Sequence, residues 1–117
     1  MWESIKQDVL DDLVEIRKQT NLTKLYITGI SMGGGLTVIS YIDIAHFEVF
    51  PSVVMTTFGA PRVGNKHWAA HFELLTAGQT RRYIIKLDPI VVLPRCLTLL
   101  CSYRHTGRQI VCNTNTQ

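Results

Sequence analysis

The stretch that decides the fold is Leu25-Tyr26-Ile27-Thr28-Gly29-Ile30-Ser31-Met32-Gly33, where a short β-forming run ends in Gly-x-Ser-x-Gly and an apolar stretch follows. A strand, a glycine-flanked serine and a helix in this order form the context of a nucleophile elbow. Such a sharp turn holds its serine in a strained backbone conformation. We expect side chains at positions 29 and 33 to collide with the neighbouring strand and helix. The pattern therefore predicts a serine hydrolase with Ser31 as its nucleophile.

The residues after the serine support this interpretation and exclude two phosphate-binding motifs. Gly34 and Gly35 let the next helix approach the strand closely, and its first amides face the place where an oxyanion develops. A P-loop requires Lys and then Ser or Thr after its last glycine, where this chain has Leu36. A dinucleotide fingerprint requires a third glycine where this chain has Val38. For the five-residue pattern alone, a glycine-rich loop without chemistry is the alternative.

Composition limits the class of protein. The chain has 117 residues, of which 46% are hydrophobic and 18% charged, and this favours one globular domain over residues 1–117. The net charge of +3 is small and the basic residues are scattered, which argues against nucleic-acid binding. We expect no transmembrane segment, because no apolar run approaches the ~20 residues that span a bilayer. Acidic residues follow Met1 where a secretory signal is basic and then apolar, so a cytoplasmic location is the default.

The spacing of cysteine and histidine indicates neither a metal site nor a cofactor. Cys96, Cys101 and Cys112 are odd in number, which excludes a complete disulfide framework. Reduced thiols are the default, while a single pair, Cys96–Cys101 or Cys101–Cys112, stays open. His67 and His71 are four residues apart but lack the Glu of His-Glu-x-x-His, so we expect them to be solvated helix residues.

The hydrophobic pattern predicts alternating helices and strands. We expect helices over residues 2–20, 32–45 and 65–75, strands over 24–28, 52–58 and 83–87, and a hairpin or edge strand over 103–112. The first helix should pack on a sheet, Asn65 should cap the third helix, and strand 52–58 should be covered on both faces. This alternation implies right-handed crossovers and a mostly parallel sheet with flanking helices, an α/β three-layer architecture.

Asp88 directly follows the predicted strand 83–87. In parallel α/β sheets the functional groups lie at the carboxyl ends of the strands, so Asp88 and Ser31 should share one edge of the sheet. A carboxylate in that place can orient a catalytic histidine. The alternative for Asp88-Pro89, taken alone, is an ordinary turn at the end of a strand.

Four motifs, in order, resemble those of the fungal-type (class 3) lipase family, which has the α/β-hydrolase fold. The elbow, residues 29–35, is similar to the family's Gly-His-Ser-Leu-Gly-Gly-Ala. Residues 57–65 read Thr-Phe-Gly-Ala-Pro-Arg-Val-Gly-Asn and match a highly specific signature without a gap. Residues 88–94 resemble Asp-x-Val-Pro-x-Leu-Pro, and residues 103–107 resemble Tyr-x-His-x-Gly. From about Val9 onward the chain is similar to the second half of the lipase domain, which implies a partial α/β-hydrolase fold.

The resemblance implies a role for each site residue. Ser31 would be the acyl nucleophile, the Met32 backbone N–H one oxyanion donor and Asp88 the triad acid, acting on ester bonds of acylglycerols or related lipids. In the family the second oxyanion donor and the lid precede the first helix of this chain, and the triad histidine follows beyond Gln117. Within the chain, His105 is the candidate that could replace that histidine.

Two hypotheses about function follow. One is a lipase or esterase, completed in a longer parent chain or active through a rearrangement. The other is a catalytically incomplete fragment or a non-enzymatic, lipase-like binding module. We expect the isolated chain to be inactive. It should also self-associate through an uncovered sheet edge and helix face, and it can make interfacial contacts with lipid.

Overall fold

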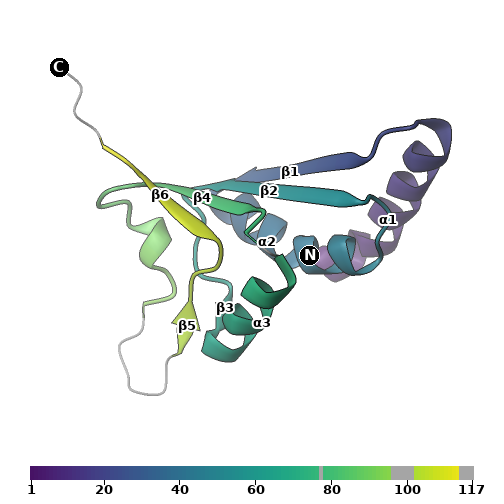
Figure 1. The fold of residues 1–117 in the computed structure, drawn as a ribbon. Helices are drawn as coiled ribbons and strands as arrows, with labels where there is room; N and C mark the ends of the chain where they lie inside the picture. Colours follow the sequence, from purple (N-terminus) through teal and green to yellow (C-terminus); the bar gives the residue numbers. More distant parts are fainter. Residues whose placement is uncertain (77, 96–101, 114–117) are drawn as a thin grey trace.

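The computed structural model describes residues 1–76, 78–95 and 102–113. Helices and strands alternate as the sequence predicts (Figure 1). In chain order the elements are α1 (Trp2–Gln19), β1 (Lys24–Ile30), α2 (Ser31–His46), β2 (Ser52–Phe58), β3 (Gly64–Asn65), α3 (Lys66–Thr76), β4 (Thr80–Ile85), the 3-10 helix η1 (Ile90–Val92), β5 (Tyr103–Arg104) and β6 (Arg108–Cys112).

Four strands form a parallel sheet in the order β1-β2-β4-β6. The predicted α/β class with a mostly parallel sheet and flanking helices is therefore confirmed. β1, which leads into Ser31, lies at one edge of the four strands. β5 pairs with β3 in a separate antiparallel ladder, whereas β6 pairs with β4. Of the two alternatives for residues 103–112, the edge strand is right and the hairpin is wrong.

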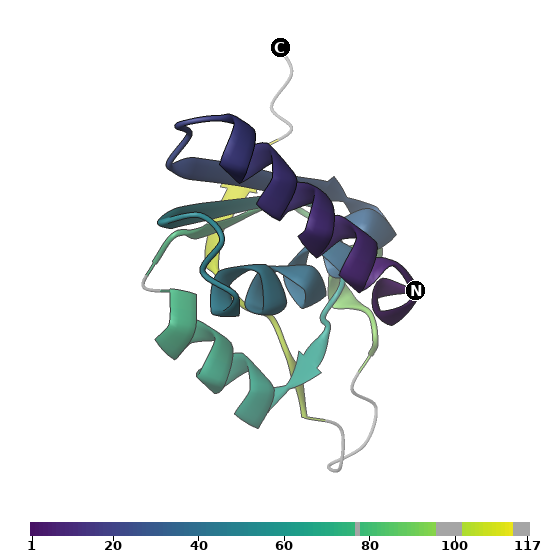
Figure 2. The ribbon, with the colours of Figure 1, turned by 90° about the vertical axis from the view of Figure 1, so that its right-hand side faces the viewer.

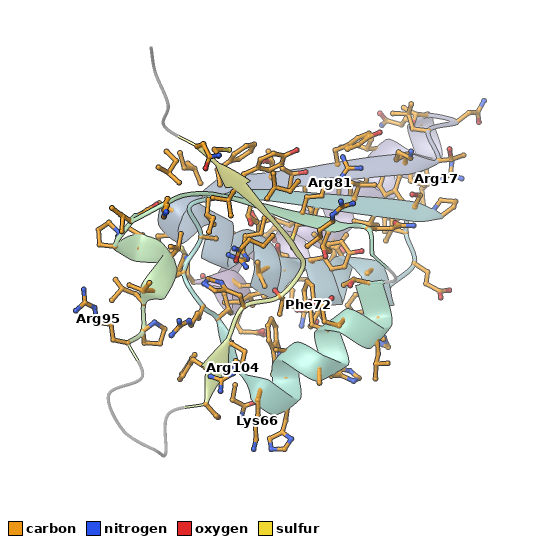
Figure 3. The ribbon with its side chains drawn as sticks, turned by 60° about the vertical axis from the view of Figure 1, so that its left-hand side comes forward. Arg17, Lys66, Phe72, Arg81, Arg95 and Arg104 are labelled. Atoms are coloured by element: carbon orange, nitrogen blue, oxygen red, sulfur yellow. The ribbon has the colours of Figure 1, made fainter. Side chains whose placement is uncertain are left out.

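The core lies between the sheet and the helices on one of its faces (Figures 1 and 2). α2 packs directly on β1 and β2, and α1 packs on α2. The Trp2 Nε1–H donates to Asp43 Oδ2 at 2.6 Å and so joins these two helices. The first helix therefore packs chiefly against α2, and its buried side chains belong to the same core as those of the sheet. Figure 3 shows Phe72 of α3 under the sheet, where its ring is fully buried against Tyr41 and Trp68.

The opposite face of the sheet is open. The strand register aligns one row of side chains across this face, namely Ile30, Phe58, Tyr83 and Ile110. The rings of Phe58 and Tyr83 stack with their centroids 5.3 Å apart. Within residues 1–76, 78–95 and 102–113, no helix packs on this side (Figure 1). The expectation that β2 is covered on both faces is therefore wrong, and only its alternate residues are buried.

Local signals set the ends of the elements. The Asn65 Oδ1 accepts a hydrogen bond from the Trp68 N–H at 2.9 Å, which confirms the predicted cap of the third helix. β4 ends at Ile85, earlier than predicted, so Asp88 lies in a turn beyond the strand. Leu87 in that turn has a φ of +72°. In the part of the chain that the structure describes, no helix has the length and apolar character needed to span a membrane.

Candidate active site

Ser31 lies at the junction of β1 and α2, where the chain reverses direction sharply. Ile30 is extended, with φ −116° and ψ 143°, whereas Ser31 has a φ of +53°. A non-glycine residue in this left-handed region is strained, and such strain is concentrated at functional sites. The serine is exposed. The backbone conformation predicted for a nucleophile elbow is therefore present.

The glycines around Ser31 have different reasons to be glycine. A Cβ on Gly29 would lie 2.3 Å from Gly33 O and 2.4 Å from Thr37 Oγ1, so that position accepts no side chain. A Cβ on Gly34 would lie 2.8 Å from the Cβ of Ala60, which confirms the predicted close approach of the helix. A Cβ on Gly33 would meet nothing within 4 Å. The predicted collision at position 33 is wrong, because Gly33 faces solvent on the first turn of α2.

The first turn of α2 supplies backbone donors beside Ser31. The first N–H groups of an α-helix have no partner within the helix. The N-cap residue, Ile30, provides no side-chain cap. The Met32 N–H belongs to this group, immediately after the serine. Its role as an oxyanion donor stays a prediction, and the local geometry is compatible with it.

Asp88 is held by the turn that follows β4. Its Oδ1 accepts a hydrogen bond from the Ile90 N–H at 2.9 Å, and its own N–H donates to Ile85 O at 3.2 Å. Gly59, directly after β2, has a φ of +56°, and a Cβ there would lie 2.9 Å from Asp88 Oδ2. Glycine at position 59 thus leaves room for the carboxylate. Sequence reasoning missed this role, although Gly59 is part of the signature at residues 57–65.

Ser31 and Asp88 line the same cavity, which has a volume of about 460 Å³. The remaining lining residues are mostly apolar: Ile30, Phe58, Gly59, Tyr83, Ile84, Ile85, Ile90 and Cys112. The shared location agrees with the prediction that nucleophile and acid lie at one edge of the sheet. An apolar wall beside a hydroxyl and a carboxylate suits a hydrocarbon chain with an ester at its end.

His105 is not brought to this cavity. Its ring is half-buried, and Nε2 lies 2.5 Å from the backbone oxygen of Val91. Burial, together with the nearby cations of Arg82 and Arg62, lowers the pKa of His105 to about 4, against the opposing effect of the Val91 hydrogen bond. The ring is therefore neutral at pH 7. Since a carbonyl only accepts, Nε2 carries the proton and donates to Val91.

Of the other histidines and cysteines considered from the sequence, only Cys112 lines the cavity among the residues that the structure describes. His67 and His71 are exposed on α3. Across residues 1–76, 78–95 and 102–113 no three His, Cys, Asp or Glu side chains gather as metal ligands would. Cys112 is exposed at the cavity. Cys96 and Cys101 fall outside the described residues, so neither of the two alternative disulfide pairs is tested.

Comparisons with known proteins agree with this geometry. The family model described as "Lipase (class 3)" matches residues 1–98. A curated relative, secreted mono- and diacylglycerol lipase 2 of Gibberella zeae, is 28% identical over 102 residues, covering 80% of this chain and 25% of the relative. The chain thus spans about a quarter of that relative's length.

Solved structures share the fold. Lipase II from Rhizopus niveus has a TM-score of 0.83 at 23% identity, covering 94% of this chain and 41% of the lipase. A triacylglycerol lipase described as having a serine protease triad as its catalytic centre has a TM-score of 0.81 at 22% identity, covering 94% and 41%. The partial α/β-hydrolase fold predicted from the sequence is confirmed.

Proposed function

This chain belongs to the class 3 lipase family, and from that premise we propose that it carries the acyl nucleophile, Ser31, and the triad acid, Asp88, of a carboxylester hydrolase. Its substrates in this proposal are acylglycerols or related lipid esters. The observation that carries the proposal is that Ser31, strained at φ +53°, and Asp88 line one apolar cavity. A strained, exposed serine has no evident value to the fold alone.

The proposed chemistry is acyl transfer in two steps. The Ser31 Oγ attacks the ester carbonyl carbon while a base accepts its proton, and the Met32 N–H donates to the oxyanion that forms. Collapse of this intermediate expels the alcohol, which takes a proton from the base. Water then attacks the acyl-serine ester and releases the fatty acid. Asp88 would orient the imidazole of the base and stabilise its cation.

The class of substrate is inferred from the cavity and from the relatives. The apolar residues on the cavity wall would bury the acyl chain and leave the ester at Ser31. The relative from Gibberella zeae is named for activity on mono- and diacylglycerols. Contact with a lipid interface through the exposed apolar row of the sheet belongs to the same proposal. That relative is also named as secreted, which differs from the cytoplasmic default, so the location of this chain stays a prediction.

The second candidate function is a catalytically incomplete, lipase-like binding module. It is favoured by one observation: the described residues that line the cavity include no histidine. Without a positioned base, Ser31 remains a protonated hydroxyl of low nucleophilicity. The isolated chain should then hydrolyse short p-nitrophenyl esters negligibly and resist labelling by a fluorophosphonate.

An external base distinguishes the two functions. We would treat the chain with a fluorophosphonate, with and without free imidazole, and quantify phosphonylation of each serine by mass spectrometry. If the elbow is competent, imidazole accepts the Oγ proton as fluoride leaves, and labelling of Ser31 should rise by about tenfold relative to exposed Ser4. The Ser31→Ala variant is the control for the site of labelling.

Two outcomes of the labelling experiment would contradict parts of this proposal. Labelling of Ser31 that stays at the rate of Ser4 in the presence of imidazole would refute the hydrolase proposal and favour the binding module. Ready labelling without imidazole, lost in both Ser31→Ala and His105→Ala, would show that His105 serves as the base.

A further inference from the structure

Three hydrogen bonds hold the backbone that follows Asp88, at Val91, Leu93 and Pro94. The His105 Nε2–H donates to Val91 O at 2.5 Å. The Arg62 N–H donates to Leu93 O at 2.7 Å, and its Nη1 donates to Pro94 O at 3.3 Å. These hydrogen bonds attach η1 and the two residues that follow Val92 to Arg62 and His105.

The two residues that make these bonds come from one small unit. β3 and β5 pair so that Gly64 lies opposite Arg104. Arg62 stands two residues before Gly64, and His105 directly follows Arg104. We call β3 and β5 with these two flanking residues the bracket. It presents both donors to the same turn, although they are far apart in sequence.

The bracket is itself anchored to the helical layer. The Gly107 N–H donates to Glu73 Oε1 on α3 at 2.5 Å, and Thr106 beside it is buried. A Cβ on Gly64 would lie 2.2 Å from the ring of Trp68, so β3 lies directly against α3. The bracket and the residues that follow His105 are thus attached to α3 as well as to the turn.

We propose that His105 is a positioning residue for Asp88: through its bond to Val91 it holds the turn in which the Asp88 carboxylate faces the cavity of Ser31. The link is short. Val91 is buried, and its neighbour Ile90 donates its N–H to Asp88 Oδ1. A shift of Val91 therefore moves the donor that orients the carboxylate. The inference depends on the proposed function only where it gives Asp88 a catalytic role.

This assignment excludes a base role for His105 in the same conformation. Nε2–H is committed to Val91 O, and the ring is absent from the wall of the Ser31 cavity. Burial keeps the ring in its neutral form, which donates from one nitrogen only. The histidine is required at this place as a short, rigid donor, not as an acceptor of the serine proton.

The test measures local hydrogen exchange in the 117-residue chain. His105→Leu removes the donor at similar bulk, and His105→Gln retains an N–H donor near the position of Nε2. Loss of one hydrogen bond to a buried group should speed exchange at the Ile90 and Leu93 amides by about tenfold in the leucine variant. The glutamine variant should exchange at nearly the wild-type rate. The Met55 amide, in the core strand β2, is the reference for global unfolding.

Several results would overturn the proposal. One is an unchanged exchange rate of the Ile90 amide in His105→Leu, and another is an equal rise in the exchange rates of the Ile90 and Met55 amides. A third is an exchange rate in His105→Gln as high as that in His105→Leu. If the leucine variant fails to fold, the wild-type ring decides: long-range ¹⁵N–¹H spectra at pH 7 should show the proton on Nε2. A proton on Nδ1 would contradict the bond to Val91.

A labelling experiment separates this inference from the proposed function. With imidazole present, phosphonylation of Ser31 should be slower in His105→Leu than in His105→Gln. Labelling without imidazole that is lost equally in both variants and restored by imidazole would identify His105 as a base and refute its positioning role. The expected exchange effects together with an unreactive Ser31 would instead support the positioning role of His105 and refute the hydrolase function.

Discussion

Replacing Gly59 by alanine should destabilise the protein and displace the Asp88 carboxylate. At φ +56° an alanine pays about 1–2 kcal/mol for the left-handed conformation. Its Cβ would also lie 2.9 Å from Asp88 Oδ2, so the carboxylate must rotate and strain its bond to the Ile90 N–H. Partial loss of that hydrogen bond adds up to about 1 kcal/mol. The total expected cost is about 1–3 kcal/mol.

Gly33→Ala is the matched control, because the same change is made where a Cβ meets nothing within 4 Å. In the first turn of α2 this substitution should stabilise the protein by about 0.5–1 kcal/mol. The assay is urea denaturation of the wild type and both variants, followed by circular dichroism. Changes of the same sign in the two variants, or a Gly59→Ala cost below 1 kcal/mol, would refute the reasoning.

Three further predictions concern charge, pH and assembly. Gln109 accepts a bond from buried Arg82 Nη2 at 2.6 Å, so Gln109→Glu should raise the free energy of unfolding by about 1 kcal/mol, measured in urea at pH 7. Folding lowers the pKa of the His105 imidazole from 6.5 to about 4. As the pH falls, the imidazole is therefore protonated in the unfolded chain before it is protonated in the folded chain. Stability should therefore fall between pH 6.5 and 4, by on the order of 1 kcal/mol for a half-buried ring, and less in His105→Gln. The chain should self-associate in sedimentation velocity runs, and Tyr26→Lys on the open face should weaken that association.

The sequence predicts the elements well where the signal is local. The bounds of α1 follow from the period of its apolar residues, and those of β2 follow from a continuous run of β-forming residues. The start of α3 follows from the Asn65 cap. The strain at Ser31 is also local, since Gly29 and the close approach of α2 leave the chain no other way to turn. Each of these features depends on residues within one turn or one strand.

The errors arise where the outcome depends on distant residues. β2 is rich in β-forming residues throughout, so its composition does not tell which face meets the helices. The ladder of β3 and β5 is too short to carry a hydrophobic period, and its strands are far apart in the chain. The need for glycine at position 59 arises from Asp88, which a reading of local turn chemistry does not connect with it.

These long-range contacts give the signature motifs a common physical purpose. Gly59 leaves space for Asp88 Oδ2, Arg62 holds Leu93 and Pro94, and His105 holds Val91. All three contact the turn that carries Asp88 or the residues that follow it. Only Gly59 among them lines the cavity. The nucleophile is positioned within its own strand and helix, whereas the acid lies in the turn between β4 and η1, outside both elements. A carboxylate in such a turn needs contacts from elsewhere in the chain, and the two motifs that flank it in sequence supply them.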